Sequence, residues 1–135
     1  MSQDDRPGPR VISTPGAPRA IGPYSQALSA GGLTFVSGQI PLDPETGELV
    51  GAGDVVAQTR RVMQSLLAIV EAAGHARHEI VRCTIFLKNL DDFQAVNGAY
   101  AEALGDHRPA RATVEVARLP RDVLVEIDAT CARAP

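Results

Sequence analysis

Apolar and polar positions alternate with two different periods along this chain, and these periods predict a mixture of strands and helices. Residues 33–39 and 80–88 (LTFVSGQ and IVRCTIFLK) are rich in β-branched and aromatic side chains, which favours strands. Between residues 55 and 70 the apolar side chains recur instead at intervals of three and four, the spacing of a helix face. Asp54 is a suitable N-cap for that helix, and Gly74 provides its stop.

The second half of the chain continues this pattern. Asp91 or Asp92 caps a second predicted helix, which ends near Gly105. Two further strands are expected around residues 112–117 and 123–131, and the short turn between them predicts an antiparallel hairpin. Two helices and about six strands make an α+β fold in which the helices cover only one face of the sheet. The other face needs a partner, so we expect an oligomer.

Length and charge restrict the class of protein. A chain of 135 residues is long enough for one domain with a real core. Its net charge is -3 and charges of neither sign form a run, so the chain offers no electrostatic attraction for a nucleic acid. The first residues contain prolines and arginines but no apolar stretch, so we expect a flexible arm at 1–18 and a single domain at 19–135. No stretch is apolar and long enough to span a membrane.

Cysteine and histidine suggest neither a disulfide framework nor a metal site. Cys83 and Cys131 fall in apolar, strand-like runs, which favours two buried reduced thiols and a cytoplasmic location. None of the serines lies in a G-x-S-x-G elbow, and no histidine is close enough in sequence to activate one, so serine hydrolase chemistry is not expected. Three histidines lack the spacing of metal ligands, and no metal is expected. They are His75, His78 and His107.

The run PARATVEVARLP at residues 109–120 places one arginine at the mouth of a strand-like segment. Strand side chains alternate, so Arg111 shares a face with Thr113 and Glu115, while the intervening alanine and valines form an apolar face that we assign to the core. A guanidinium on a rigid strand can present its fork of donors to a planar carboxylate. Arg111 is therefore a candidate carboxylate clamp, and the alternative is a solvated arginine at a strand end.

Three more polar residues lie at positions where structural packing alone would favour other residue types. Glu126 lies in the final predicted strand and shares a face with Asp128, where it could also be a plain exposed carboxylate. Asn97 follows Phe93 on the helix stripe that we expect to be buried, either as a functional amide or as a brace for a loop. Tyr24 follows an Ile-Gly-Pro turn and either packs with a satisfied hydroxyl or contacts a ligand.

Several stretches, in order from about residue 12 to the end, resemble the RidA (YjgF-like) family of enamine and imine deaminases. The matching segments are AIGPYSQ (20–26), VSGQIP (36–41), IVEAAG (69–74), the pattern from Leu90 to Tyr100, and PARATVEVARLP (109–120). The resemblance implies a chorismate-mutase-like α+β fold: one mixed six-stranded sheet with two helices on one face. It also implies a homotrimer with three active sites in the clefts between subunits.

The same resemblance implies roles for the polar residues. Arg111 would grip the substrate carboxylate, and Glu126 would be the acid/base that activates the water adding to the C=N carbon. The implied reaction is hydrolysis of 2-iminobutanoate and 2-iminopropanoate, the imine tautomers of 2-aminocrotonate and 2-aminoacrylate, to 2-oxo acids and ammonia, without a cofactor. Burial would raise the pKa of Glu126 and a nearby Arg111 would lower it. The residues implied to line the pocket are Tyr24, Ser37, Gly38, Asn97 and Thr113. The predicted hairpin places Arg111 and Glu126 on adjacent strands, so we expect both to reach a site from the same chain.

Two departures from the best-known family members touch this site. Thr113 stands where they have cysteine, and the connection from Tyr100 to Arg111 is shorter and lacks an aromatic residue before Pro109. A divergent member acting on another imine is therefore an alternative. A protein that senses a 2-oxo acid or amino-acid metabolite would need Arg111 but not Glu126. Some relatives have been described as ribonucleases or translation inhibitors, but the acidic balance and the few aromatic residues of this chain conflict with that role. A structural or chaperone-like protein is the least specific alternative.

Overall fold

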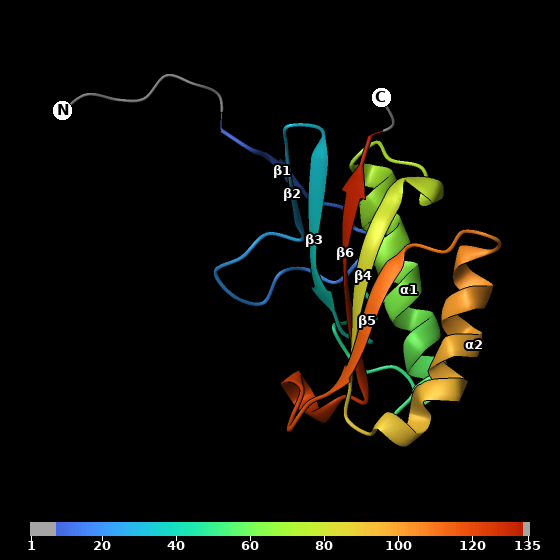
Figure 1. The fold of residues 1–135 in the computed structure, drawn as a ribbon. Coiled ribbons are helices and arrows are strands. Elements are labelled where there is room, and N and C mark those ends of the chain that lie inside the picture. Colours follow the sequence, from blue (N-terminus) through green and yellow to red (C-terminus); the bar gives the residue numbers. More distant parts are fainter. Residues whose placement is uncertain (1–7, 134–135) are drawn as a thin grey trace.

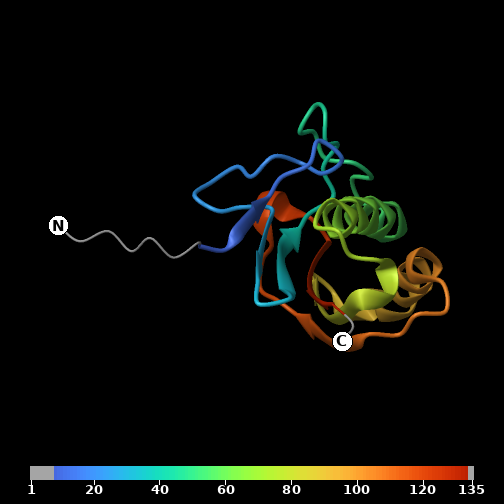
Figure 2. The same ribbon diagram turned by 90° about the horizontal axis from the view of Figure 1, so that it is seen from above.

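The computed structural model describes residues 8–133, and this part of the chain contains six strands and two α-helices. The strands are β1 (Arg10–Ile12), β2 (Ala27–Ala30), β3 (Leu33–Gln39), β4 (Ile80–Leu87), β5 (Ala110–Glu115) and β6 (Val125–Ala132), and the helices are α1 (Val55–Ala72) and α2 (Phe93–Leu104). All six strands form one sheet in the order β1-β2-β3-β6-β4-β5 (Figure 1). Both helices lie against the same face (Figure 2). The predicted mixed six-stranded sheet with helices on one face is confirmed.

The first helix forms as its sequence pattern predicts. Asp54 is the N-cap, and its carboxylate accepts a hydrogen bond from the Ala57 amide at 3.1 Å. The helix ends at Ala72 with Ala73 as its C-cap, and Gly74 follows with a φ of 85°, a conformation that favours glycine. Large apolar side chains on one face are fully buried, each stabilising the fold by about 1.5–3 kcal/mol. They include Val62, Met63, Leu66, Ile69 and Val70.

The second helix is capped differently from the prediction. Asp92 occupies the N-cap position, but its side chain makes no capping hydrogen bond. A short 3-10 turn, η2 (Leu90–Asp92), precedes the helix, and there the Asn89 side chain accepts from the Asp91 amide at 2.9 Å. The cap at the start of this segment is therefore Asn89. The predicted C-terminal end is confirmed at Gly105, whose φ is 66°.

The predicted hairpin between the last two strands is wrong. β5 pairs in parallel with β4, and β6 pairs antiparallel with both β4 and β3, so β4 lies between β5 and β6. The connecting segment contains the 3-10 turn η3 (Pro120–Asp122), in which Arg121 and Asp122 have φ values of 55° and 56°. This segment crosses the end of β4 instead of reversing the chain tightly, because β4 satisfies its backbone groups by pairing on both sides.

The N-terminal segment joins the sheet earlier than expected. Residues 1–7 of the expected arm lie outside the described residues, but β1 pairs with β2, and Ile12 and Ala17 are buried. The Gln26 side chain holds this segment: its amide oxygen accepts from the Thr14 backbone at 2.7 Å, and its nitrogen donates to carbonyls that include Pro18 at 2.9 Å. The arm predicted for residues 1–18 therefore does not extend through residues 10–18.

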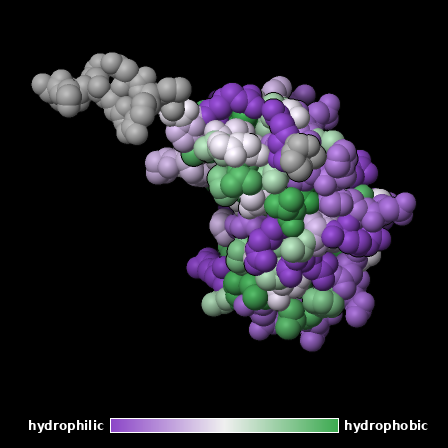
Figure 3. All heavy atoms as spheres, turned by 45° about the horizontal axis from the view of Figure 1, so that its top comes forward, coloured by the Kyte–Doolittle hydropathy of each residue, from purple (hydrophilic) through white to green (hydrophobic). Residues whose placement is uncertain are grey.

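The face of the sheet opposite the helices, here called the open face, carries exposed apolar side chains. On the view in Figure 3, apolar residues form patches interrupted by polar ones. The apolar face of β5 belongs to this open side, where Val114 is 42% exposed, so its assignment to the core is wrong. Edge strand β5 turns its polar face, with Arg111, toward α2 instead. The exposed apolar residues include Leu33, Phe35, Val81 and Val114.

Both cysteines, Cys83 and Cys131, are buried free thiols, as predicted. Within residues 8–133, no helix has the length and apolar character required to cross a membrane.

Candidate functional site

The Arg111 guanidinium lies over two aromatic rings of α2. Its central carbon is 5.5 Å from the centroid of the Phe93 ring and 5.2 Å from that of Tyr100. The two rings stand about two helical turns apart on one face of the helix. Such cation–π contacts contribute about 0.5–2 kcal/mol each and restrict the guanidinium. Its N–H donors make no hydrogen bond or ion pair with residues 8–133, so Arg111 is a positioned cation with free donors.

Two more candidate residues share this side of the sheet with Arg111. Asn97 lies between Phe93 and Tyr100 on the same stripe of α2 and is half-buried. Thr113 lies on the same face of β5 as Arg111, and its hydroxyl is buried without a hydrogen-bond partner in the described part of the chain. A buried hydroxyl without a partner costs about 1–3 kcal/mol, which a bound ligand could recover. We call Arg111, Asn97 and Thr113 the arginine cluster.

The groups beneath the arginine cluster are held in their neutral forms. Burial, together with the neighbouring Cys83 thiol, raises the pKa of the Tyr100 hydroxyl well above its ordinary value. Burial also raises the pKa of Cys83. A thiol in that state is a poor nucleophile. The arginine cluster can therefore bind and orient an anion, but these two groups do not provide covalent chemistry.

Glu126 lies on the open face of the sheet. Along β6 the buried residues Val125 and Ile127 face the helices, and the half-buried Glu126 and Asp128 point the other way. The Glu126 carboxylate lies against Gly38 of β3: a Cβ added at Gly38 would stand 2.9 Å from the Glu126 carboxyl carbon. Only a glycine leaves room for the carboxylate in this position.

The pKa of Glu126 is raised. Burial is the main cause, and the like charge of Asp128 adds to it. Of the two opposing influences expected from the sequence, burial therefore dominates within the subunit, where the sheet separates Glu126 from Arg111. A carboxyl with a raised pKa is better matched to proton transfer near neutral pH than an ordinary glutamate.

Ser37 and Tyr24 lie near Gly38 in different roles. The Ser37 hydroxyl donates to the Ser25 carbonyl at 2.6 Å, so it holds the loop that carries Tyr24. Tyr24 is 49% exposed, and its hydroxyl accepts from the Ile21 amide at 3.3 Å. Its ring lines both an open groove of about 830 Å³ and, with Gly38, a hollow of about 20 Å³. We call Tyr24, Ser37, Gly38 and Glu126 the glutamate cluster.

The structure does not bring the two clusters together within one subunit. Arg111 pairs in register with Cys83, whose side chain faces the helices, whereas Glu126 pairs with Phe86 on the other side of β4. Their side chains therefore lie on opposite faces. The expectation that the two residues lie on adjacent strands is wrong, because β4 separates β5 from β6. Their placement on opposite faces argues against the expectation that one chain supplies both.

Sequence reasoning missed two contributors to these clusters. The stacking of Arg111 on Phe93 and Tyr100 follows from the position of β5 over α2, although the spacing of the two rings indicated a shared helix face. The effect of Asp128 on Glu126 could have been inferred from their alternation along one strand. Within residues 8–133 no group of three or more His, Cys, Asp or Glu side chains is placed to hold a metal ion.

Comparison with known proteins shows what the chain is similar to. Residues 14–133 match the family model described as Endoribonuclease L-PSP. A RutC family protein of Pyrococcus horikoshii is 52% identical over 119 residues, or 88% of this chain and 94% of the relative. A 2-iminobutanoate/2-iminopropanoate deaminase of Salmonella typhimurium is 48% identical over 127 residues, which cover 92% of this chain and 98% of the relative. The crystal structure of E. coli TdcF with bound serine is 42% identical, with a TM-score of 0.88 over 93% of this chain and 99% of that one.

Proposed function

Since the chain belongs to the Endoribonuclease L-PSP (YjgF/RidA) family, we propose that it is an enamine/imine deaminase that converts 2-iminobutanoate and 2-iminopropanoate to 2-oxo acids and ammonia. The observation that carries the proposal is the Arg111 guanidinium, which is stacked on two rings and whose donors have no hydrogen-bond partner within residues 8–133. Relatives named as deaminases with this activity, and a related structure with bound serine, support a substrate that carries nitrogen beside a carboxylate.

The arginine cluster would bind the substrate. The planar fork of Arg111 can make two parallel hydrogen bonds to the carboxylate, each charge-assisted bond contributing about 1.5–3 kcal/mol. The unpartnered Thr113 hydroxyl lies two residues along the same strand face and would bond the substrate beside the carboxylate. Asn97, on the helix stripe between the stacked rings, would fix the orientation of the imine. These contacts would hold the reacting carbon in place.

Glu126 would move the proton. As a carboxylate it accepts a proton from the water whose oxygen bonds to the C=N carbon, and it passes that proton to the nitrogen, which gives a carbinolamine. It then accepts the hydroxyl proton of the carbinolamine and delivers it to the nitrogen as the C–N bond breaks. Ammonia leaves, the C=O bond of the 2-oxo acid forms, and Glu126 is again a carboxylate. One water is consumed and no oxidant or reductant is needed, so the reaction balances without a cofactor.

Each active site would lie between two subunits of a homotrimer. A substrate of a few atoms cannot touch both Arg111 and Glu126 in one subunit, because the sheet separates them. A neighbour that covers the open face would bring its arginine cluster toward the glutamate cluster on that face and bury the exposed apolar residues, among them Phe35, which is 50% exposed.

A coupled assay tests this function directly. A dehydratase that depends on pyridoxal phosphate generates 2-aminoacrylate, and pyruvate release is followed with and without the protein. We expect acceleration by the native protein, loss in Arg111→Ala, and a loss of about tenfold or more in Arg111→Lys, because an ammonium cannot reproduce two parallel hydrogen bonds. Arg60→Lys is the matched control, since Arg60 is exposed and, in the described part of the chain, pairs only with exposed Glu102. Near-normal turnover by Arg111→Lys would contradict the clamp.

A metabolite-binding protein is the second candidate. The arginine cluster is complete without Glu126, so it could bind a 2-oxo or amino acid with no reaction. Carboxylate binding that is unchanged in Glu126→Gln, by a native protein that accelerates no imine hydrolysis, would favour it. Hydrolysis of a different imine only would indicate a divergent member of the family, consistent with Thr113 and the shorter connection before Arg111.

A further inference from the structure

A second polar cavity lies at the opposite edge of the sheet from Arg111. It has a volume of about 210 Å³ and is lined by the start of β1, the β2–β3 turn, the C-terminal end of α1 and the residue after β6. None of the residues of the arginine or glutamate clusters lines it. Because β1 and β5 are the two edge strands, this cavity is separate from the proposed active site.

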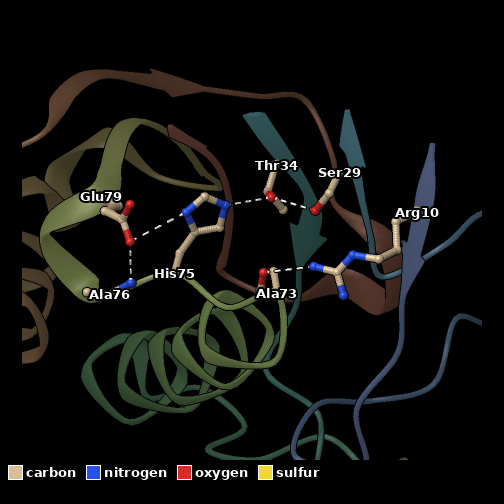
Figure 4. A network of polar contacts seen from close by, with 7 residues as sticks. All are labelled: Arg10, Ser29, Thr34, Ala73, His75, Ala76 and Glu79. Atoms are coloured by element: carbon tan, nitrogen blue, oxygen red, sulfur yellow. Dashed lines mark hydrogen bonds and ion pairs between the residues drawn. The ribbon is translucent and has the colours of Figure 1, made fainter. Parts of the chain in front are cut away.

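Two arginines give the cavity its charge. Arg10 is held in place by a hydrogen bond from its Nη2 to the Ala73 carbonyl at 2.9 Å (Figure 4). Arg133 is anchored through its backbone amide, which donates to the Gly32 carbonyl at 3.0 Å, and its guanidinium lies beside Gly74. No acidic side chain of the described residues lines the cavity. Its walls therefore carry two cations without an anion among the described residues.

A chain of hydrogen bonds fixes a hydroxyl in the same wall. Ser29 Oγ lies 2.6 Å from Thr34 Oγ1, which lies 2.8 Å from His75 Nε2 (Figure 4). His75 Nδ1 in turn faces the Glu79 carboxylate at 3.6 Å. Thr34 and His75 are buried, so this chain is rigid and ends at the less buried Ser29. The sequence showed no histidine near a serine, because His75 reaches Ser29 only through the fold.

We propose that this cavity, with Arg10, Arg133 and Ser29 in its walls, is a second binding site for a small oxyanion, separate from the active site. Arginine forks match the geometry of carboxylate and phosphate groups. The Ser29 hydroxyl can donate to the anion in the arrangement in which His75 Nε2 donates to Thr34 and Thr34 donates to Ser29. The volume suits a phosphate ion or a short carboxylate, since pockets for larger organic ligands are about 300–1,000 Å³. Both ligands present the same chemistry, an oxygen-rich anion, and differ in their source.

Isothermal titration calorimetry of the whole protein at constant ionic strength tests the site, with inorganic phosphate in one arm and pyruvate in the other. Arg111→Ala protein is used so that the active-site clamp does not contribute. We expect saturable binding of at least one of the two anions, one per subunit, and weakening by about tenfold or more when Arg133→Gln is added, as for loss of one charge-assisted pair. The anion that binds more tightly shows whether the natural ligand is a phosphate or a carboxylate.

Arg60→Gln is the matched control, because it removes the same charge from an exposed position away from the cavity. Arg10→Gln also removes the bond to Ala73, so Arg133→Gln and Ser29→Ala are the deciding variants and thermal unfolding verifies that each is folded. Absence of saturable binding of both anions would overturn the proposal. Equal weakening by Arg60→Gln and Arg133→Gln would also overturn it, because the effect would then come from net charge.

Discussion

The Arg111 guanidinium and the Glu126 carboxylate lie on opposite faces of one sheet, with β4 between the strands that carry them. Arg111 lies toward the helices, over Phe93 and Tyr100, and Glu126 lies on the open face against Gly38. If both residues act on one substrate, they come from different subunits. On the proposed mechanism the assembly would then be part of the chemistry, and a complementation test can check this.

Mixing two inactive variants should restore activity. In a cyclic trimer each cleft would take Arg111 from one subunit and Glu126 from its neighbour. A cleft is then intact when an Arg111→Ala subunit supplies the glutamate and a Glu126→Gln subunit supplies the arginine. Random reassembly of equal amounts after dissociation should restore about a quarter of the clefts. The coupled pyruvate assay measures the recovery.

The control is a mixture in which one variant carries both substitutions. It can complete no cleft with either single variant, so it should stay inactive. Size-exclusion chromatography with light scattering should give a trimer for every mixture. Trimers that exchange subunits but recover no activity would show that one chain supplies both residues, contrary to the face assignment.

Gly38→Ala should abolish most activity while leaving the fold intact. The added Cβ would overlap the Glu126 carboxylate and displace it from the position proposed for proton transfer. We expect a fall in kcat of about 10² or more, approaching the usual contribution of a positioned acid/base. Gly98→Ala is the matched control, because a Cβ on Gly98 of α2 meets nothing within 4 Å. It should keep full activity and stabilise the helix by about 0.5–1 kcal/mol. Equal kcat in both variants would contradict the role of Gly38.

The helices and the main strands could be predicted from the sequence because local signals determine them. Asp54 and the apolar stripe of α1 needed no knowledge of distant contacts. The order of the strands could not be predicted in this way. A short turn after β5 is typical of a hairpin, but the pairing of β4 with both β5 and β6 depends on contacts far apart in sequence.

That error in strand order carried through to the site. Every candidate residue was chosen from the sequence, but Arg111 and Glu126 were expected on adjacent strands. Their true separation follows from the insertion of β4. The cavity around Arg10 shows the same limit, since Ser29, Thr34 and His75 meet only when the β2–β3 turn packs beside the end of α1.

The activity of the protein should fall on the acid side as Glu126 becomes protonated. Its pKa is raised in the folded state, so the acid limb of kcat/KM should lie above 4.5, the ordinary value for a glutamate. Asp128→Asn removes the like charge and should move this limb to lower pH. In the native protein the Thr84 amide donates to the Asp128 carboxylate at 3.1 Å. An asparagine at this position still offers an oxygen to that amide, so the strand pairing is kept. Asp91→Asn removes an exposed charge that is not among the causes of the raised pKa of Glu126, so it should leave the limb in place.

The same raised pKa has a consequence for stability. Folding favours the protonated form of Glu126, so its contribution to stability is present at low pH and is lost as the pH rises through its folded-state pKa. A glutamine at this position does not ionise, so the Glu126→Gln variant does not lose this stability as the pH rises. Urea unfolding at neutral pH should therefore give the glutamine variant a stability equal to or greater than that of the native protein, with the difference shrinking below pH 4.5. A destabilised variant at neutral pH would contradict the assignment.

Thr113→Val should separate binding from stability. The Thr113 hydroxyl is buried without a partner in the described chain, so an isosteric valine should leave the Tm unchanged or raise it. If the hydroxyl bonds to the substrate, kcat/KM should fall by about tenfold, as for loss of one hydrogen bond. Thr113→Ser and Thr113→Cys should retain most activity, because no covalent intermediate is proposed at this residue. Thermal unfolding and the coupled assay measure both effects. A covalent adduct on Thr113 in intact mass spectra would overturn the non-covalent role, and full activity of the valine variant would remove Thr113 from the site.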